Sequence, residues 1–325
     1  MQALVTSDSW IEALAVLARR SRCPVCSGEP LSTDDHALAC GACDRRWPVI
    51  SDRPLAVRLA PGTVDAAGEP FRGPPVARSR LRRAVWRWHA RREERFASRI
   101  PALPDSQAPR ILHAFEALPA DRRSVLDVGG GRGRWRVLLG NPADYTIADV
   151  VEPETSSLAA DTTYVVADAV ALPFAAGTFD LVLMIEVLQH LPEPARALAE
   201  ASRVLAPGGV LVLTARQAWR THGAPHDYFR FTRYGLEQLL RTSGLRSIEL
   251  IPLGGPASVV TVALENNVPV LAKPFVKQLV SHQVWRLAAL LDRAAFGDNL
   301  AGSSPEASGW LVIAHAGSDN GGGRR

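Results

Sequence analysis

Four cysteines stand close together near the amino terminus, in two CxxC pairs separated by thirteen residues: Cys23 with Cys26, and Cys40 with Cys43. A CxxC turn presents two thiolates to one ion, and structural Zn²⁺ sites take four tetrahedral ligands. We therefore expect a structural Zn²⁺ whose four positions are all filled by these cysteines, with none left open for water or substrate. Two disulfides or free thiols are the alternative, and His36 between the pairs is a poorer candidate ligand.

A second group of chemically suited residues lies at 124–135, where the sequence reads SVLDVGGGRGRW. Asp127 and the glycines after it follow the spacing D-x-G-x-G-x-G. The four glycines are Gly129, Gly130, Gly131 and Gly133. Glycines allow the backbone to turn tightly beneath a ligand. A dinucleotide-binding loop requires glycine where Arg134 stands, and a P-loop requires a Gly-Lys-Ser/Thr run that is missing here, so both of these loops are excluded.

Apolar segments alternate with helical patterns around and after this loop. The predicted strands span 123–128, 145–149, 163–167, 179–185, 209–215, 246–252 and 309–317. Helical patterns separate most of them, notably at 193–205 and 232–242. Alternation of this kind indicates an α/β fold, in which helices cover both faces of a mostly parallel sheet.

Composition shifts divide the chain into parts. Residues 1–58 hold an amino-terminal helix and the cysteine segment, and 59–78 form a linker rich in Pro, Gly and Ala. The main domain spans 79–318, with amino-terminal helices at 79–118 and a helical insertion at 256–300. The tail at 319–325 is expected to be disordered.

The glycine loop, two later acidic residues and the segment 179–214 together resemble class I S-adenosylmethionine-dependent methyltransferases. Asp149 ends the second predicted strand about twenty residues after the loop, where an acidic side chain suits two ribose hydroxyls. Asp168 ends the third predicted strand. The segment FDLVLMIEVLQHLPEPARALAEASRVLAPGGVLVLT is similar to the fourth and fifth strands of ubiquinone-biosynthesis-type members. The resemblance implies a Rossmann-like, seven-stranded methyltransferase sheet.

The resemblance also implies S-adenosyl-L-methionine as the methyl donor. Asp127 would accept from the donor's ammonium group and Asp168 would bind the adenine amino group, although a loop-capping role is the alternative for Asp168. Glu186 follows strand four and would line the donor pocket. The other expected donor contacts are the four glycines, Asp149, Val150 and Ala169. His190 is a candidate acid or base, and a structural role is its alternative.

The cysteine segment resembles the small zinc-ribbon activator subunit of tRNA and protein methyltransferases. That family carries two cysteine pairs and then an aromatic-Pro-Ile-Asp-Gly-Ile-Pro run. The residues that fit this run are Trp47, Pro48, Val49, Asp52 and Pro54. Ser51 and Arg53 depart from it. The resemblance implies a small amino-terminal zinc ribbon.

The loop at 216–231 carries the side chains expected to meet the methyl acceptor, because loops above strand ends build such pockets. His226 and Asp227, with His190, are the candidate catalytic residues. His222, Tyr228 and Arg230 are the candidate substrate contacts. A structural lid, in which Asp227 pairs with an arginine and the aromatic residues pack, is the alternative.

The segment 78–99 reads as a helix with nine arginines around Trp86 and Trp88. Such a helix can bind RNA phosphates and stack on bases. The alternative, which we favour, is an amphipathic connecting helix whose arginines face water, partly matched by Glu93 and Glu94. The acceptor loop also lacks the Asn/Asp-Pro-Pro-aromatic motif of enzymes that methylate base amino groups.

The bulk composition is that of an ordinary globular protein, with 47% hydrophobic and 22% charged residues and a net charge of +4. No apolar run reaches the roughly 18 residues that a membrane span needs, and no signal-peptide pattern is recognisable, so a cytoplasmic location is expected. We predict a methyltransferase for a small molecule, such as a sugar, a secondary metabolite or another metabolite. An RNA methyltransferase and a non-catalytic donor-binding scaffold or activator are the alternatives; the sequence leaves the oligomeric state open.

Overall fold

The computed structural model describes ten stretches of the chain. They are residues 9–34, 37–52, 55–59, 108–116, 118, 124–152, 158–267, 284–285, 287–295 and 306–317. Several predictions lie outside the described residues: those for His36, the linker from residue 60 on, the arginine-rich helix at 78–99, much of the 256–300 insertion, and the tail at 319–325.

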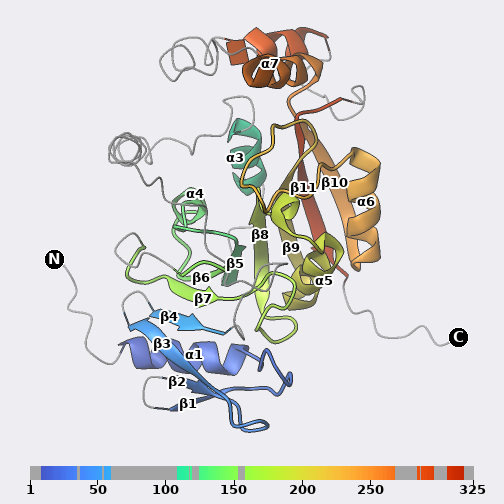
Figure 1. The fold of residues 1–325 in the computed structure, drawn as a ribbon. Helices are drawn as coiled ribbons and strands as arrows, with labels where there is room; N and C mark the ends of the chain where they lie inside the picture. Colours follow the sequence, from blue (N-terminus) through green and yellow to red (C-terminus); the bar gives the residue numbers. More distant parts are fainter. Residues whose placement is uncertain are drawn as a thin grey trace, which may run out of the picture.

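A mixed β-sheet of eleven strands runs through the described residues, in the order β1-β2-β3-β4-β7-β6-β5-β8-β9-β11-β10 (Figure 1). The strands are β1 (Ser32–Asp34), β2 (Ala37–Ala39), β3 (Arg46–Asp52), β4 (Leu55–Arg58), β5 (Ser124–Val128), β6 (Asp144–Asp149), β7 (Thr163–Val166), β8 (Phe179–Ile185), β9 (Leu205–Arg216), β10 (Leu245–Leu253) and β11 (Gly309–Ala316). All neighbours from β4 to β9 are parallel, whereas β11 runs antiparallel to both β9 and β10.

The prediction of a seven-stranded sheet is not confirmed, because the sheet has eleven strands. The strands β5–β11 coincide with the seven segments for which strands were predicted. The other four come from the amino-terminal segment, which extends the sheet: β4 pairs in parallel with β7, and the amide of Leu59 donates to the carbonyl of Val166 at 3.0 Å. A β-strand edge is a ready partner for another strand, and here β4 covers the edge of β7.

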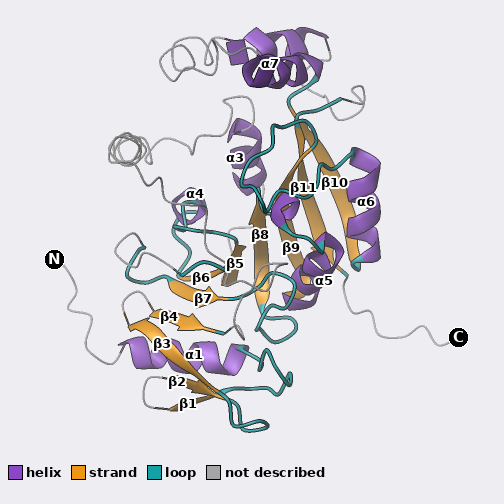
Figure 2. Ribbon diagram, viewed as in Figure 1, coloured by secondary structure: helices purple, strands orange, loops and turns teal. Residues whose placement is uncertain are grey.

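Helices cover both faces of the sheet (Figure 2). They are α1 (Ser9–Arg20), α3 (Ala108–Glu116), α4 (Trp135–Leu138), the 3₁₀ turn η2 (Leu188–His190), α5 (Pro194–Val204), α6 (Arg233–Thr242) and α7 (Pro256–Asn267), with further helical residues at 284–285 and 287–295. Successive strand residues alternate between two buried clusters, as the pleat requires: Val125 belongs to the cluster that includes residues of α3, and Leu126 to the one that includes residues of α1, α5 and α6. The helices of the described residues include none with the length and hydrophobicity of a membrane span.

The start of α7 is held by a buried carboxylate. Asp292, 3% exposed, accepts hydrogen bonds from the amides of Gly255, Ala257 and Ser258 at 2.8, 2.8 and 3.2 Å and from the Ser258 hydroxyl at 2.7 Å. The first amides of a helix have no partner within the helix, and a negative charge there is favourable. Asp292 therefore fixes the 287–295 helix against the start of α7.

Candidate functional site

Three acidic residues lie at the carboxyl ends of three neighbouring strands. Asp127 stands next to the end of β5, Asp149 is the last residue of β6, and Asp168 follows β7 by two residues. The three strands are adjacent and parallel, so the three residues share one edge of the sheet. Ligands of open α/β sheets bind in the crevice outside this edge.

Asp149 holds the glycine loop against the end of β6. Its Oδ2 accepts from the amide of Gly131, and its Oδ1 from the amide of Val151, both at 3.1 Å. Burial raises the pKa of Asp149, and the backbone hydrogen bonds act in the opposite direction. Each carboxylate oxygen has two acceptor positions, so Asp149 retains the capacity to accept from two ligand hydroxyls.

Asp127 lies beneath the loop and is 1% exposed. Its Oδ2 accepts from the hydroxyl of Tyr145, and its Oδ1 is buried without a hydrogen-bond partner. Burial raises the pKa of Asp127 to about 7, although the Tyr145 hydroxyl acts in the opposite direction. A buried acceptor left without a partner costs about 1–3 kcal/mol, so a cationic ligand group at Oδ1 would be stabilised. Tyr145 was not among the predicted site residues; nothing in its strand pattern marks it.

The glycines of the loop are required for two different reasons. A Cβ at Gly129 would lie 2.6 Å from Cγ2 of Val187, and one at Gly130 would lie 2.4 Å from Oδ2 of Asp127, so neither position has room for a side chain. Gly129, Gly131 and Gly133 have positive φ angles of 68°, 54° and 67°. A Cβ at Gly131 would meet nothing within 4 Å. The loop is therefore packed tightly from below and open above Gly131.

The other expected donor contacts lie along the same edge. Oδ1 of Asp168 accepts from the amide of Val170 at 3.0 Å, which is the loop-capping contact given above as its alternative role. This bond occupies one oxygen and leaves Oδ2 for a ligand. Val150 is half-buried directly after Asp149, and Ala169 is buried after Asp168.

Glu186 is committed to contacts within the protein. Its backbone has a φ of 61°, its Oε1 accepts from the Thr214 hydroxyl at 2.9 Å, and its Oε2 lies 2.5 Å from Nε of Arg216. Arg216 is 4% exposed and lies 4.2 Å from the ring centre of Trp219. Glu186 thus joins the end of β8 to the end of β9, where the 216–231 loop begins. The buried Arg216 was not among the predicted residues.

Asp227 and Arg230 form an ion pair inside the 216–231 loop. The two guanidinium Nη atoms lie 2.6 and 2.9 Å from the two carboxylate oxygens, and the amide of His222 donates to Oδ2 at 2.8 Å. Arg230 also donates to the carbonyls of Trp219 and Arg220. The hydrogen bonds from Arg230, aided by the others, lower the pKa of Asp227 to about 2. These contacts correspond to the structural lid given above as the alternative.

The three histidines predicted near the acceptor lie together. Nδ1 of His190 is 2.6 Å from the carbonyl oxygen of His226, and the rings of His190 and His222 meet edge to face with centres 4.7 Å apart. Nδ1 of His226 lies 3.1 Å from the Tyr228 hydroxyl. The amides of Tyr228 and Phe229 both donate to the carbonyl of Gln189, at 2.9 and 3.3 Å. The loop therefore closes directly on η2.

The four cysteines form a compact group in the amino-terminal segment. Their Sγ atoms all lie within 4.8 Å of one another, with 3.7 Å between Cys23 and Cys43 and 3.5 Å between Cys26 and Cys40. Four thiolates at about 2.3 Å from one tetrahedral Zn²⁺ would be about 3.8 Å apart. The spacing and the all-sulfur donor set fit this ion.

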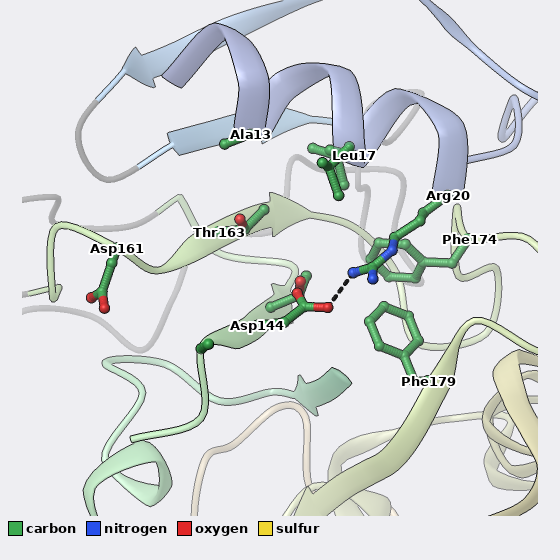
Figure 3. Close-up of a pocket in the computed structure, with 11 residues that line it drawn as sticks. Ala13, Leu17, Arg20, Asp144, Asp161, Thr163, Phe174 and Phe179 are labelled. Atoms are coloured by element: carbon green, nitrogen blue, oxygen red, sulfur yellow. Dashed lines mark hydrogen bonds and ion pairs between the residues drawn. The ribbon is translucent and has the colours of Figure 1, made fainter. Parts of the chain in front are cut away.

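A separate cavity of about 330 Å³ lies between α1 and the first residues of β6 and β7 (Figure 3). Arg20 of α1 forms an ion pair across it with Asp144, the first residue of β6. Phe174 and Phe179 line its apolar side, with ring centres 5.0 Å apart. Because Asp144 and Asp149 are at opposite ends of β6, this cavity lies at the strand starts, away from the three-carboxylate edge.

Comparisons with known proteins agree with this placement. Residues 126–213 match the family model described as "Methyltransferase domain". An "Uncharacterized methyltransferase" of Mycobacterium avium (strain 104) is 32% identical over 147 residues, which cover 43% of this chain and 57% of that protein. The "Ubiquinone/menaquinone biosynthesis C-methyltransferase UbiE" of Roseobacter denitrificans is 35% identical over 107 residues, covering 29% of this chain and 43% of that protein.

A solved structure, Burkholderia thailandensis 1,6-didemethyltoxoflavin-N1-methyltransferase, aligns over 88% of this chain and 99% of that one, with 16% identity and a TM-score of 0.42. The chain spans little more than half the length of the first of these curated relatives. The matched segment begins one residue before Asp127 and ends near the end of β9, so it contains the glycine loop, all three carboxylates and His190. The chain therefore carries a methyltransferase domain at residues 126–213.

Proposed function

We propose that this protein transfers a methyl group from S-adenosyl-L-methionine to a small-molecule acceptor. The observation that carries the proposal is the row of carboxylates at the ends of β5, β6 and β7 around a glycine loop that is open at Gly131. A methyl donor brings one group for each of them: an ammonium for Asp127, ribose hydroxyls for Asp149 and an adenine amino group for Asp168. When bound, the donor supplies an electrophilic methyl on a sulfonium.

The orphan oxygen of Asp127 supports this assignment over a phosphate-bearing ligand. A buried carboxylate next to a phosphate would add repulsion between like charges, whereas next to an ammonium it gains a charge-assisted hydrogen bond. We infer a cationic, phosphate-free ligand at this edge.

We propose that the 216–231 loop covers the acceptor, with His222, Tyr228 and Arg230 on the acceptor side. The loop follows β9 at the same edge and is bound to Gln189 and His190, which follow β8. The amino-terminal segment would hold one structural Zn²⁺ through its four cysteines, and its role would be to stabilise the fold, because the four thiolates leave no coordination position for a substrate.

Donor binding and acceptor class are tested together. Calorimetry with S-adenosylmethionine and S-adenosylhomocysteine should show binding of one molecule per chain. Transfer of a radiolabelled methyl group is then measured with a small-molecule library, total RNA and the protein alone. Label in small molecules is expected. Label only in RNA, or donor binding without any transfer, would favour the RNA-methylating or the non-catalytic alternative instead.

A further inference from the structure

We propose that His190 is the general base of this site and that the acceptor is a phenol or other aryl hydroxyl. This inference rests on the proposed function and narrows its substrate class. Three observations carry it: the hydrogen bond that fixes the His190 ring, the commitment of the competing Asp227 to Arg230, and the aromatic side chains that the loop places beside η2.

The hydrogen bond to the His226 carbonyl sets the tautomer of His190. A carbonyl oxygen only accepts, so Nδ1, at 2.6 Å, must carry the hydrogen. A neutral imidazole then has its lone pair on Nε2. Among the described residues, no group forms a hydrogen bond with Nε2 of His190. This nitrogen is therefore an oriented proton acceptor.

The loop also fixes the orientation of the ring. Gly223 has a φ of 74°, and a Cβ there would lie 3.2 Å from Cε1 and 3.3 Å from Nδ1 of His190. The His222 ring packs edge-on against His190. The loop thus contacts the ring at Nδ1 and Cε1, and neither contact involves Nε2.

His190 is also connected to the donor loop. It lies at the end of η2, and its amide donates to the carbonyl of Val187 at 2.9 Å. Val187 is the side chain against which Gly129 packs. One turn of 3₁₀ helix therefore joins the proposed base to the loop that would hold the methyl donor.

The other candidate bases are less suited to the role. Asp227 is bound at both oxygens by Arg230, which lowers the pKa of Asp227 to about 2 and makes it a weak base. The His226 ring contacts the Tyr228 hydroxyl, and the backbone carbonyl of His226 accepts the hydrogen bond from Nδ1 of His190. Burial and the neighbouring His190 lower the pKa of His222. A neutral His222 adds no second positive charge beside His190 when His190 takes up a proton.

The aromatic residues of the loop indicate which hydroxyl is deprotonated. Tyr228 and Phe229 are 37% and 39% exposed and are bound through their amides to Gln189, the neighbour of His190. Exposed rings at this position offer an aromatic acceptor offset-stacked or edge-to-face contacts. An imidazole also removes a proton far more readily from a phenol, with a pKa of about 10, than from an aliphatic hydroxyl, whose acidity is near that of water.

Methyl transfer begins with deprotonation of the acceptor. The hydroxyl proton passes to Nε2 of His190, and the phenolate oxygen attacks the methyl carbon in line with the carbon–sulfur bond. The O–C bond forms as the C–S bond breaks, and both electrons of the broken bond stay on sulfur. The products are an aryl methyl ether, S-adenosylhomocysteine and an imidazolium, which returns its proton to water.

The test uses a series of phenols whose pKa falls from about 10 to below the assay pH. His190→Asn keeps an amide donor for the His226 carbonyl and removes the Nε2 lone pair. We expect His190→Asn to lower kcat/KM about 10²–10⁴-fold for the weakest acid and to have little effect for phenols already ionised. The matched control is His113→Gln on α3, an exposed histidine whose loss should change neither end of the series.

Other outcomes would overturn the proposal. If His190→Asn lowers kcat/KM equally for every phenol, His190 only shapes the loop. If the loss of kcat/KM grows with the pKa of the phenol in His226→Ala but not in His190→Asn, His226 is the base. Methylation of amines, carbon acids or aliphatic alcohols but of no phenol would refute the acceptor class. Calorimetry with S-adenosylhomocysteine on each variant separates these results, since a wild-type protein that binds no donor would refute the proposed function itself.

Discussion

The guanidinium of Arg22 binds the carboxylate of Glu200, with Nη2 at 3.0 Å from Oε2 and 3.2 Å from Oε1. Arg22 directly precedes Cys23, the first of the four cysteines, whereas Glu200 lies on α5 in the methyltransferase domain. The amide of Arg22 also donates to the carbonyl of Pro173 at 3.1 Å. The cysteine segment is thereby bound to α5 and to the loop that follows β7.

We expect loss of the proposed metal to weaken donor binding, because these contacts connect the cysteine segment to α5 and to the loop after β7. Cys40→Ser or chelation should remove one Zn²⁺ per chain, which elemental analysis would detect, and should lower the thermal midpoint, because structural Zn²⁺ contributes on the order of 10 kcal/mol to folding. Arg22→Met should keep the metal but weaken donor binding. Zinc-free protein with unchanged donor affinity would contradict this coupling, and Ser32→Ala on β1 is the control.

An aspartate stands at each end of β6, and the two positions provide a matched pair of variants that tests the proposed donor site. Asp149→Asn should weaken S-adenosylhomocysteine binding about 10–100-fold, because it removes charge-assisted hydrogen bonds worth about 1.5–3 kcal/mol. Asp144→Asn changes the same residue type at the other end of the strand, beside Arg20, and should leave the affinity unchanged. Calorimetry on both variants is the measurement; equal effects would move the donor away from this edge.

The buried carboxyl of Asp127 should lower the free energy of unfolding at neutral pH and above, and at the same time strengthen binding of the proposed donor. Its pKa in the folded protein, about 7, lies above the ordinary value of 3.8. Stability therefore falls as pH rises from about 4 to 7, because over this range the carboxyl ionises in the unfolded chain but stays protonated in the folded one. Asp127→Asn should therefore raise the free energy of unfolding at pH 8, by up to about 4 kcal/mol, and have little effect at pH 4. Denaturant unfolding at both pH values measures this change.

The same variant should bind the donor more weakly, because the neutral amide no longer attracts the ammonium group. Glu237→Gln, which removes a half-buried carboxylate of α6 paired with Arg241, is the control: it should leave donor binding unchanged and lower the free energy of unfolding by no more than about 0.5 kcal/mol. If Asp127→Asn destabilises the protein at pH 8, the buried carboxyl is stabilised by contacts other than that of Tyr145.

The Asp227–Arg230 pair should act on the loop rather than on chemistry. The pKa of Asp227 is lowered to about 2, so the stabilising contribution of its charge is complete above about pH 4 and is lost only as pH falls through about 2. Asp227→Asn should cost about 2–3 kcal/mol of stability and increase hydrogen exchange over 216–231. Its effect on turnover should be the same for every phenol of the series. A loss that grows with the pKa of the phenol would make Asp227 the base.

The local pattern of apolar residues was sufficient to predict most of the core strands. The apolar runs that became β5–β11 alternate between two buried clusters, and burial of both faces leaves each such run few other conformations. The glycine spacing and the acids at the ends of β5, β6 and β7 are likewise local, because parallel strands bring their carboxyl ends to one edge. These features could be predicted residue by residue.

Contacts between distant residues could not be predicted in this way. The CxxC pairs indicate a metal, but they do not indicate that β4 pairs with the edge of β7. No residue pattern in a strand specifies which other strand its edge will pair with. The sequence of the 216–231 loop, with its His, Asp, Tyr and Arg residues, does not show which of these side chains are already bound to other groups of the protein. The fold pairs Asp227 with Arg230 and turns Nδ1 of His190 to a backbone carbonyl 36 residues away. Sequence by itself determined the strands and the donor loop; only the tertiary structure decided which groups remain available, since hydrogen-bond partners are set by distance in space.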